Sequence, residues 1–257
     1  MERIDNRQNN EMRSIKMTPG FISSADGSVL IEMGNTRVIC NATLLPEVPG
    51  WLKGRGTGWV TAEYSLLPQS TNKRVDRERK GASGRTQEIQ RLIGRSLRGA
   101  ADLAALGENA IVVDCDVIQA DGGTRTASII GGFVALGLAL KKIKAYLGIE
   151  QQILKYAISA ISVGVVKGEA LLDLCYVEDS AADVDMNVVM RNAKEFIEVQ
   201  GTGEHAAFDR KMLSTLLDLG EKACSEIYSM QMNYLSKNKS ECFQKLQWVF
   251  DKTHYMK

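Results

Sequence analysis

The chain has 257 residues, of which 44% are hydrophobic and 25% charged, and its formal net charge is +1; these values are typical of a globular protein with one large or two small domains, and they exclude a polycation. We expect neither a transmembrane helix, since no run of about 18 apolar residues occurs, nor a secretory signal, since the N-terminus is polar. Five scattered cysteines without a C-x-x-C pair indicate reduced thiols in a cytoplasmic protein rather than a disulfide framework or a zinc knuckle.

The first predicted elements are strands. Residues 27–45 predict a hairpin, because two apolar runs flank the turn dipeptide Gly34-Asn35. Residues 58–68 predict another strand. The polar segment 69–84 has almost no apolar residues and predicts a mobile surface loop. Residues 85–106 then repeat an apolar side chain every three or four positions, which predicts a helix.

Charge is distributed unevenly along the chain. Residues 73–98 hold nine basic side chains against three acidic ones, whereas residues 169–185 hold six acidic side chains and no Lys or Arg. A basic segment suits a polyanion and an acidic segment suits a cation, as a nucleic-acid enzyme with a divalent metal requires. The alternative is a pair of independent, solvated charged faces.

A glycine-rich turn separates a predicted strand, residues 109–120, from a long apolar helix that ends in lysines. Its sequence is Asp-Gly-Gly-Thr-Arg-Thr, from Asp121 to Thr126. Thr124 and Arg125 would lie at the helix N-terminus, where unpaired N–H groups and the helix dipole attract anions. Arginine adds a fork of donors suited to phosphate. The turn therefore predicts a phosphate or phosphodiester site, with an ordinary tight turn and a solvated arginine as the alternative.

The second half of the chain again mixes strands with a long helix. Residues 156–180 predict two strands that turn near Gly168, and residues 185–191 and 195–204 predict two more. A last helix begins near Phe208. Its apolar stripe is Phe208, Met212, Leu216, Leu219, Ala223, Ile227 and Met230. Because at least four strands precede the first long helix, we expect an α+β fold rather than a doubly wound parallel sheet, with a loose duplication of the two halves.

The acidic segment places Glu178, Asp179, Asp183 and Asp185 within eight residues. It follows an alternation at residues 172–177 that predicts a strand with two different faces. Crowded carboxylates raise one another's pKa unless water or a cation offsets their repulsion, and oxygen ligands suit Mg²⁺ or Mn²⁺. Asp179 and Asp185, at the end of one predicted strand and the start of the next, can converge on one ion. The alternative is a solvated acidic loop.

Other catalytic signatures are missing from the sequence. Only two histidines are present, and no Ser or Cys motif accompanies His205, which we expect to be structural. A G-x-x-x-x-G-K-[ST] loop does not occur, which excludes a P-loop ATPase.

Four segments resemble those of the ribonuclease PH family in their order and spacing. They are SGRTQEIQRLIGRSLR (83–98), DCDVIQADGGTRTASIIGGFVAL (114–136), LDLCYVEDSAADVDMNVV (172–189) and EVQGTGEHAAF (198–208). The N-terminal RIDNR also resembles a variant of the family's R-x-D-G-R opening. The resemblance covers about residues 1–235, which we expect to form one catalytic domain; residues 236–257 are a tail to which it assigns nothing.

The resemblance implies a fold, an assembly and an activity. The fold is two pseudo-symmetric β-α units, as in a ribosomal small-subunit protein domain, and the assembly is a homohexameric ring built as a trimer of dimers, without a membrane partner. Such enzymes trim the 3′ ends of tRNA precursors and other structured RNA: inorganic phosphate attacks the terminal phosphodiester and a nucleoside diphosphate leaves. The reverse reaction adds nucleotides. The runner-up is a non-catalytic RNA-binding ring subunit, which would tend to lack the acidic pair or the phosphate arginine.

The resemblance also implies residue roles. Arg85, together with Gly123, Thr124 and Arg125, resembles the phosphate-binding set. Asp179 and Asp185 resemble the catalytic acidic pair, which holds Mg²⁺ or Mn²⁺ or assists proton transfer to the leaving 3′ oxygen. Further arginines are expected to contact RNA, or to support packing and ring contacts: Arg74, Arg77, Arg79, Arg91 and Arg95. One departure is Gln69, where the family often has arginine.

Overall fold

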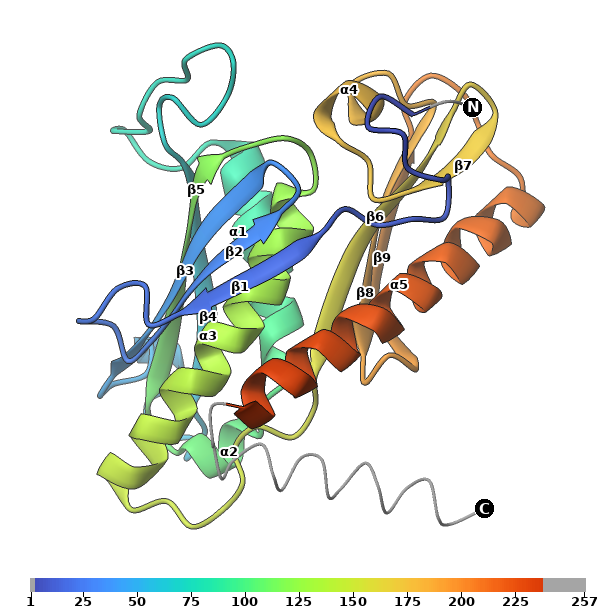
Figure 1. Ribbon diagram of the computed structural model, residues 1–257. Coiled ribbons are helices and arrows are strands. Elements are labelled where there is room, and N and C mark those ends of the chain that lie inside the picture. The colour runs from blue at the N-terminus through green and yellow to red at the C-terminus, as the bar shows by residue number, and fades with distance from the viewer. Residues whose placement is uncertain (1–2, 238–257) are drawn as a thin grey trace, which may run out of the picture.

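The first of two structural units is built on a five-stranded sheet in a computed structural model that describes residues 3–237. Its strands are ordered β1-β2-β3-β5-β4, and only the β4–β5 pair is parallel (Figure 1). The elements are β1 (Ile15–Pro19), β2 (Gly27–Met33), β3 (Thr36–Leu45), a 3₁₀ turn (Gly50–Leu52), β4 (Trp59–Leu66), α1 (Gly84–Arg98), α2 (Leu103–Leu106), β5 (Ala110–Gln119) and α3 (Thr124–Leu147).

The second unit is a four-stranded antiparallel sheet in the order β7-β6-β8-β9, followed by a long helix. Its elements are β6 (Ile158–Val166), β7 (Glu169–Leu172), α4 (Tyr176–Asp179), β8 (Val184–Arg191), β9 (Glu195–Gly203) and α5 (Arg210–Lys237). Each unit thus sets a sheet against a long helix, which confirms the predicted α+β fold of two related units. The first unit has an extra parallel crossover through α1. The predicted tail, residues 236–257, lies almost wholly outside the described residues.

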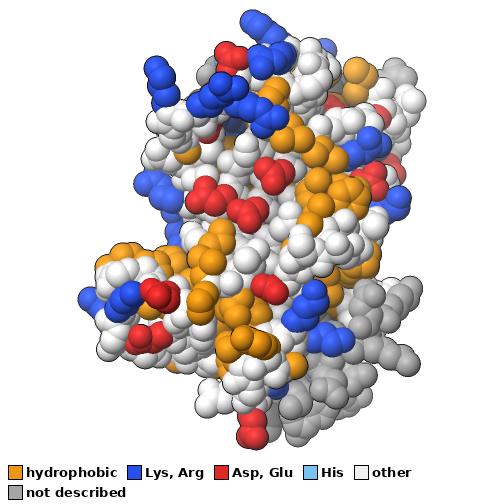
Figure 2. Space-filling model, turned by 90° about the vertical axis from the view of Figure 1, so that its left-hand side faces the viewer, with side chains coloured by type: hydrophobic (Ala, Val, Ile, Leu, Met, Phe, Trp, Pro, Cys, Tyr) orange, Lys and Arg blue, Asp and Glu red, His pale blue; other side chains and the backbone are white. Residues whose placement is uncertain are grey.

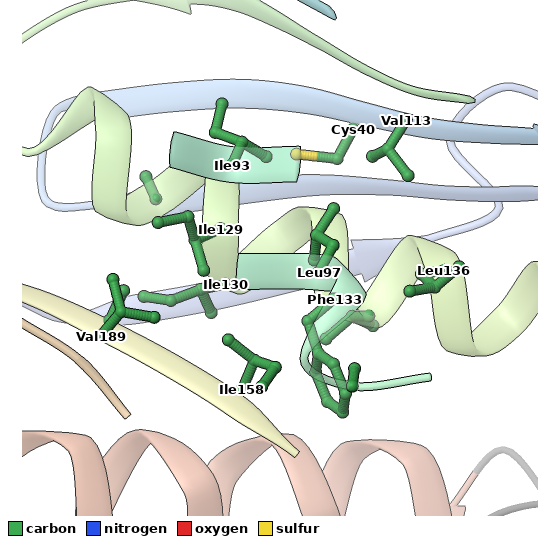
Figure 3. Close-up of a cluster of buried hydrophobic side chains, with 14 of the residues drawn as sticks. Cys40, Ile93, Leu97, Val113, Ile129, Ile130, Phe133, Leu136, Ile158 and Val189 are labelled. Carbon is green, nitrogen blue, oxygen red and sulfur yellow. The ribbon is translucent and has the colours of Figure 1, made fainter. Parts of the chain in front are cut away.

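Helix α3 forms the shared core of the two units. It packs on β2 and β3 of the first sheet and on β6 of the second, and Phe133, Ile129 and Leu136 are fully buried in this cluster (Figure 3). Within residues 3–237, α3 is the one helix whose length and composition would allow it to cross a membrane. However, 83% of its most apolar window is buried inside the protein. The helix therefore holds both units in a fixed relation.

The predicted helix over residues 85–106 is wrong at one point, because the chain leaves the helix at Gly99. Backbone N–H groups of Lys155 and Tyr156 both donate to the carbonyl of Ala100, and Asp102 donates to Ile153. This pairing with a distant segment competes with helix propagation. Asp102 then caps the short helix α2 by accepting from the N–H of Ala105.

The apolar stripe of α5 is correct along most of the helix and wrong at its end. Leu216, Ala223 and Ile227 are buried, but Met230 is 39% exposed and Gln231 is fully buried instead. The Gln231 amide donates to the carbonyl of Ile158 at 2.9 Å. A polar side chain can occupy this core position because β6 supplies a hydrogen-bond acceptor there.

Candidate active site

The glycine turn between β5 and α3 is pressed against the second unit. Gly122 and Gly123 both adopt positive φ angles, 73° and 65°, which favour glycine. A Cβ on Gly122 would collide with the carbonyl of Leu174. The turn places Thr124 and Arg125 in the first turn of α3, as predicted, where backbone N–H groups have no partner within the helix. The Tyr64 hydroxyl, from β4, donates to Thr124 Oγ1 at 2.9 Å.

Arg125 lies in the interior of the site with one donor unused. Its side chain is 18% exposed, and its guanidinium lies 3.6 Å from Glu88 Oε2. Its Nε is buried and has no hydrogen-bond partner among the described residues. Because a buried donor without a partner costs roughly 1–3 kcal/mol, an anion that accepts from this nitrogen would be stabilised here.

Arg85 takes the equivalent position in another helix. It is the second residue of α1, as Arg125 is of α3, and its side chain is exposed. The N-cap Ser83 accepts from the N–H of Thr86 at 3.2 Å, which fixes the start of α1. Two helix N-termini, each bearing an arginine, therefore contribute to the site.

The strand predicted over residues 172–177 is wrong. Strand β7 ends at Leu172, Asp173 has a left-handed φ of 54°, and residues 176–179 form the short helix α4. Asp173 is fully buried and its carboxylate accepts two hydrogen bonds from the Arg13 guanidinium, so a buried ion pair fixes the turn. Asp179 consequently ends a helix, while Asp185 is the second residue of β8.

The four predicted side chains share one electrostatic environment. Burial raises the pKa of Asp179, and burial together with the neighbouring Asp179 charge raises the pKa of Asp185 to about 6. The positive charges of Arg125 and Arg85 act in the opposite direction on both carboxyls, and Glu204 raises both pKa values further. The structure therefore brings the acidic pair and the two arginines together, and the alternative of a solvated acidic loop does not describe these half-buried carboxyls.

The acidic pair is suited to an ion that brings further ligands with it. No group of three or more His, Cys, Asp and Glu side chains within residues 3–237 is arranged to hold a metal. Mg²⁺ is commonly held by one or two carboxylates together with waters and substrate phosphates. The hard oxygen donors of Asp179 and Asp185, whose mutual repulsion a cation would relieve, fit Mg²⁺ or Mn²⁺ in that manner.

The arginines predicted to contact RNA fall into two groups. Arg74, Arg77 and Arg79 are exposed on the loop 67–83, which projects at the same end of the molecule as α4 (Figure 1). Lys and Arg side chains gather at that end of the surface (Figure 2). Arg95 instead forms a two-pronged ion pair with Glu198 of β9, at 2.6 and 3.0 Å. This contact ties α1 to the second unit and fits the packing role.

Two other residues that the sequence analysis named are exposed to solvent. Arg91 lies exposed on α1, and Gln69 is exposed at the start of the basic loop. His205, expected to be structural, is also exposed, and its backbone N–H donates to the carbonyl of Asp183 at 3.3 Å.

Sequence reasoning missed several groups around the site. Tyr64 contacts Thr124, Glu204 acts on both aspartates, and Arg13 reaches the carbonyl of Asp121. Tyr64 falls in the predicted strand 58–68, whose inward alternation would have placed it in the core. Glu204 lies in the family-like segment 198–208 but was given no role there, and Arg13 carried no signal, because charged residues outside a motif are most often solvated.

Comparison with known proteins matches nearly the whole chain to one family. A sequence model described as "3′ exoribonuclease family, domain 1" matches residues 11–141, and the model for domain 2 matches residues 156–223. Ribonuclease PH of Syntrophomonas wolfei is 56% identical over 237 residues, which are 91% of this chain and 99% of the relative. Ribonuclease PH of Bdellovibrio bacteriovorus is 52% identical over 235 residues, 91% of this chain and 97% of that protein.

Solved structures show the same fold at lower sequence identity. Rice Rrp46 superposes with a TM-score of 0.74 at 20% identity and covers 91% of this chain and 100% of its own. An Archaeoglobus fulgidus exosome structure with RNA bound to the active site gives a TM-score of 0.74 at 21% identity, covering 89% of this chain and 92% of that chain.

Proposed function

The chain belongs to the ribonuclease PH family of 3′ exoribonucleases, and from that premise we propose that its site holds inorganic phosphate and an RNA 3′ end side by side. It is a phosphate-dependent 3′→5′ exoribonuclease of the nucleotidyltransferase class that acts in tRNA processing. The observation that carries the assignment of the site is the buried, unpaired Nε of Arg125 beside two half-buried carboxyls. The precursors of tRNA and other structured RNA are the substrates in this proposal.

The physical problem in this reaction is the approach of two anions. An oxygen of inorganic phosphate attacks the terminal phosphorus, the bond to the preceding nucleotide's 3′ oxygen breaks, and that oxygen gains a proton. A nucleoside diphosphate and a shortened RNA leave. Arg85, Arg125 and the N–H groups at the start of α3 would hold the phosphate and offset its repulsion from the phosphodiester. A side-chain nucleophile has no part in the reaction.

Asp179 and Asp185 share the electrostatic environment of Arg85 and Arg125 and would serve one of two roles. As ligands they would hold Mg²⁺ or Mn²⁺, which would neutralise charge on the transferring phosphoryl group. As an acid, a carboxyl whose pKa is raised to about 6, as that of Asp185 is, would deliver a proton to the leaving 3′ oxygen. A non-catalytic ring subunit is the second candidate, but the chain retains both arginines and both aspartates, which favours an active enzyme.

A homohexameric ring is part of the same proposal. Helices cover one face of the first sheet. On the other face, every second side chain of a strand points outward and stays partly exposed. Burial raises the pKa of Asp114 and Asp116 on that face. The outward side chains are Leu30, Ile39, Asn41, Val112, Asp114, Asp116 and Ile118. Such a half-apolar face supports packing against another copy. A cytoplasmic location is also proposed, supported by the free thiols of the cysteines within residues 3–237, which are Cys40, Cys115, Cys175 and Cys224.

The assay for the proposed function is a tRNA carrying a short 3′ extension, incubated with Mg²⁺ in the presence or absence of inorganic phosphate. We expect trimming only with phosphate, and we expect nucleoside diphosphates as the products. Thin-layer or liquid chromatography separates them from monophosphates. Monophosphates released without phosphate would mean hydrolysis and would overturn the proposal.

Replacing Arg74, Arg77 and Arg79 together with alanine is expected to weaken binding of long structured RNA while short oligomers bind almost as before. Lost phosphate contacts should also flatten the salt dependence, by up to about 0.7 in the log–log slope for each single-strand contact. Filter binding over a range of salt concentrations measures both effects. The matched control replaces three exposed lysines elsewhere, Lys194, Lys211 and Lys222. Equal losses for both RNA lengths would show that the loop does not guide RNA.

A further inference from the structure

The first residues of the chain cross from the second unit to the first and bury three arginines on the way. Figure 1 shows this N-terminal arm, residues 3–14, running beside α4 and β7 before it reaches β1. The side chains of Arg3, Arg7 and Arg13 are 0%, 9% and 5% exposed. Arginine is rarely buried to this degree without a specific partner. Arg3 contacts the helix that carries Asp179, and Arg13 contacts the turn that precedes Arg125.

Arg3 is bonded to the helix that carries Asp179. Its guanidinium makes a two-pronged ion pair with Glu178, at 2.7 and 2.6 Å, and donates to the carbonyls of Leu172 and Asp173. Glu178 Oε2 also accepts from the N–H of Cys175 at 3.0 Å, so it caps α4. Because α4 is a single turn of four residues, its position depends on these bonds more than on its own helical hydrogen bonds.

Arg13 is bonded to the turn that leads to Arg125. Its guanidinium donates to both oxygens of the Asp173 carboxylate and to the carbonyl of Asp121, and it lies 3.5 Å from the carbonyl of Gly122. A Cβ on Gly123 would come within 3.0 Å of the same guanidinium. Arg13 therefore lies directly beneath the glycine turn.

The two arginine sites are joined through the side chain of Asp121. Its Oδ1 accepts from the N–H of Tyr176, the first residue of α4, at 3.2 Å. The phosphate turn and the helix bearing Asp179 are thus bonded to each other above the N-terminal arm. The backbone of Gly122 also lies against residues Leu174 to Tyr176, so the turn and the start of α4 are in direct contact.

We propose that Arg3 and Arg13 are positioning residues for the reaction: Arg3, through Glu178, sets the position of Asp179, and Arg13, through Asp121, sets the position of the Gly123–Arg125 turn. This inference rests on the proposed function of the site. It assigns a separate role to each arginine, whereas a purely structural arm would affect folding alone. The two arginines should consequently be separable in kinetics, because one supports the acidic pair and the other supports the phosphate site.

Lysine substitutions test this separation while keeping each buried positive charge beside its carboxylate. Lysine lacks the planar fork, so Arg13→Lys loses the bond to Asp121 and Arg3→Lys loses the two-pronged contact with Glu178. We expect Arg13→Lys to raise the KM for phosphate about tenfold with kcat changed less than about twofold. We expect Arg3→Lys to lower kcat about tenfold with the phosphate KM changed less than about twofold, and to weaken Mn²⁺ binding measured by electron paramagnetic resonance about tenfold.

The control is Arg191→Lys, which alters a partly exposed ion pair between Arg191 at the end of β8 and Glu195 at the start of β9. Thermal unfolding of all three variants verifies that each is folded at the assay temperature. For a variant that does not fold, Glu178→Gln replaces Arg3→Lys, and Asp173→Asn, which weakens the bonds that hold the Arg13 guanidinium, replaces Arg13→Lys, with the same expected split. Equal changes in kcat and KM for both variants, or kinetics like those of Arg191→Lys, would overturn the inference. A wild-type protein without phosphate-dependent release of diphosphates would instead overturn the proposed function.

Discussion

Replacing Arg125 with alanine is expected to raise the KM for inorganic phosphate about 10- to 100-fold, because charge-assisted hydrogen bonds of this kind are worth roughly 1.5–3 kcal/mol. The KM for RNA should change by less than about threefold, since most RNA contacts lie elsewhere. The Nε of Arg125 is already buried without a hydrogen-bond partner in the free protein. Replacing the arginine should therefore cost the folded protein little stability. Initial rates of diphosphate release, measured against phosphate at saturating RNA and then against RNA at saturating phosphate, separate the two constants.

Arg191→Ala serves as the matched control, because it removes an arginine that pairs with Glu195 and lies over the Tyr156 ring, away from the glycine turn. Its two KM values should stay at the wild-type level. Equal increases in both constants for Arg125→Ala would assign this residue to general substrate binding and remove it from the phosphate site.

Asp185→Asn should stop phosphorolysis and, at the same time, stabilise the folded protein above pH 6. The pKa of Asp185 is raised from 3.8 to about 6, chiefly by burial and then by the Asp179 charge. Between these two values the folded state binds more protons than the unfolded state, so the stability of the wild type falls as the pH rises. Above about pH 6 the ionised carboxylate costs at most about 3 kcal/mol, a cost that the neutral amide avoids.

Thermal unfolding near pH 5 and near pH 7.5, with a chelator present, measures this effect, and the variant should gain more at the higher pH. Asp183→Asn, two residues earlier in the same segment, is the control for removing one negative charge. Diphosphate release at the wild-type rate would remove Asp185 from the mechanism. A lower unfolding midpoint for Asp185→Asn near pH 7.5 would show that the ionised carboxylate stabilises the fold.

Short glycine-containing motifs correctly predicted turns whose backbone conformation few residue types can adopt. Gly34-Asn35 predicted the hairpin of β2 and β3, and Gly122-Gly123 predicted the turn into α3, because only a few residue types adopt these backbone conformations. The predicted phosphate arginine and acidic residues also share one site, although their partners were invisible in the sequence. Motif spacing therefore predicted which side chains come together better than it predicted the structure around them.

The failures arose where residues far apart in the chain determine the local structure. The break after Arg98 depends on residues 153–156, and the turn at Asp173 depends on Arg13. Likewise, no periodicity would indicate that Gln231 finds an acceptor on β6. Each of these features costs free energy when considered locally and is stabilised only in the folded chain.

The pairing of Arg3 with Glu178, 175 positions apart, also bears on the order in which the protein is made. Translation delivers the arginine 175 residues before the glutamate. A nascent or prematurely terminated chain shorter than this cannot form the contact, whatever else it folds. In the role that we propose for Arg3, the acidic pair therefore cannot be fully positioned until Glu178 has left the ribosome.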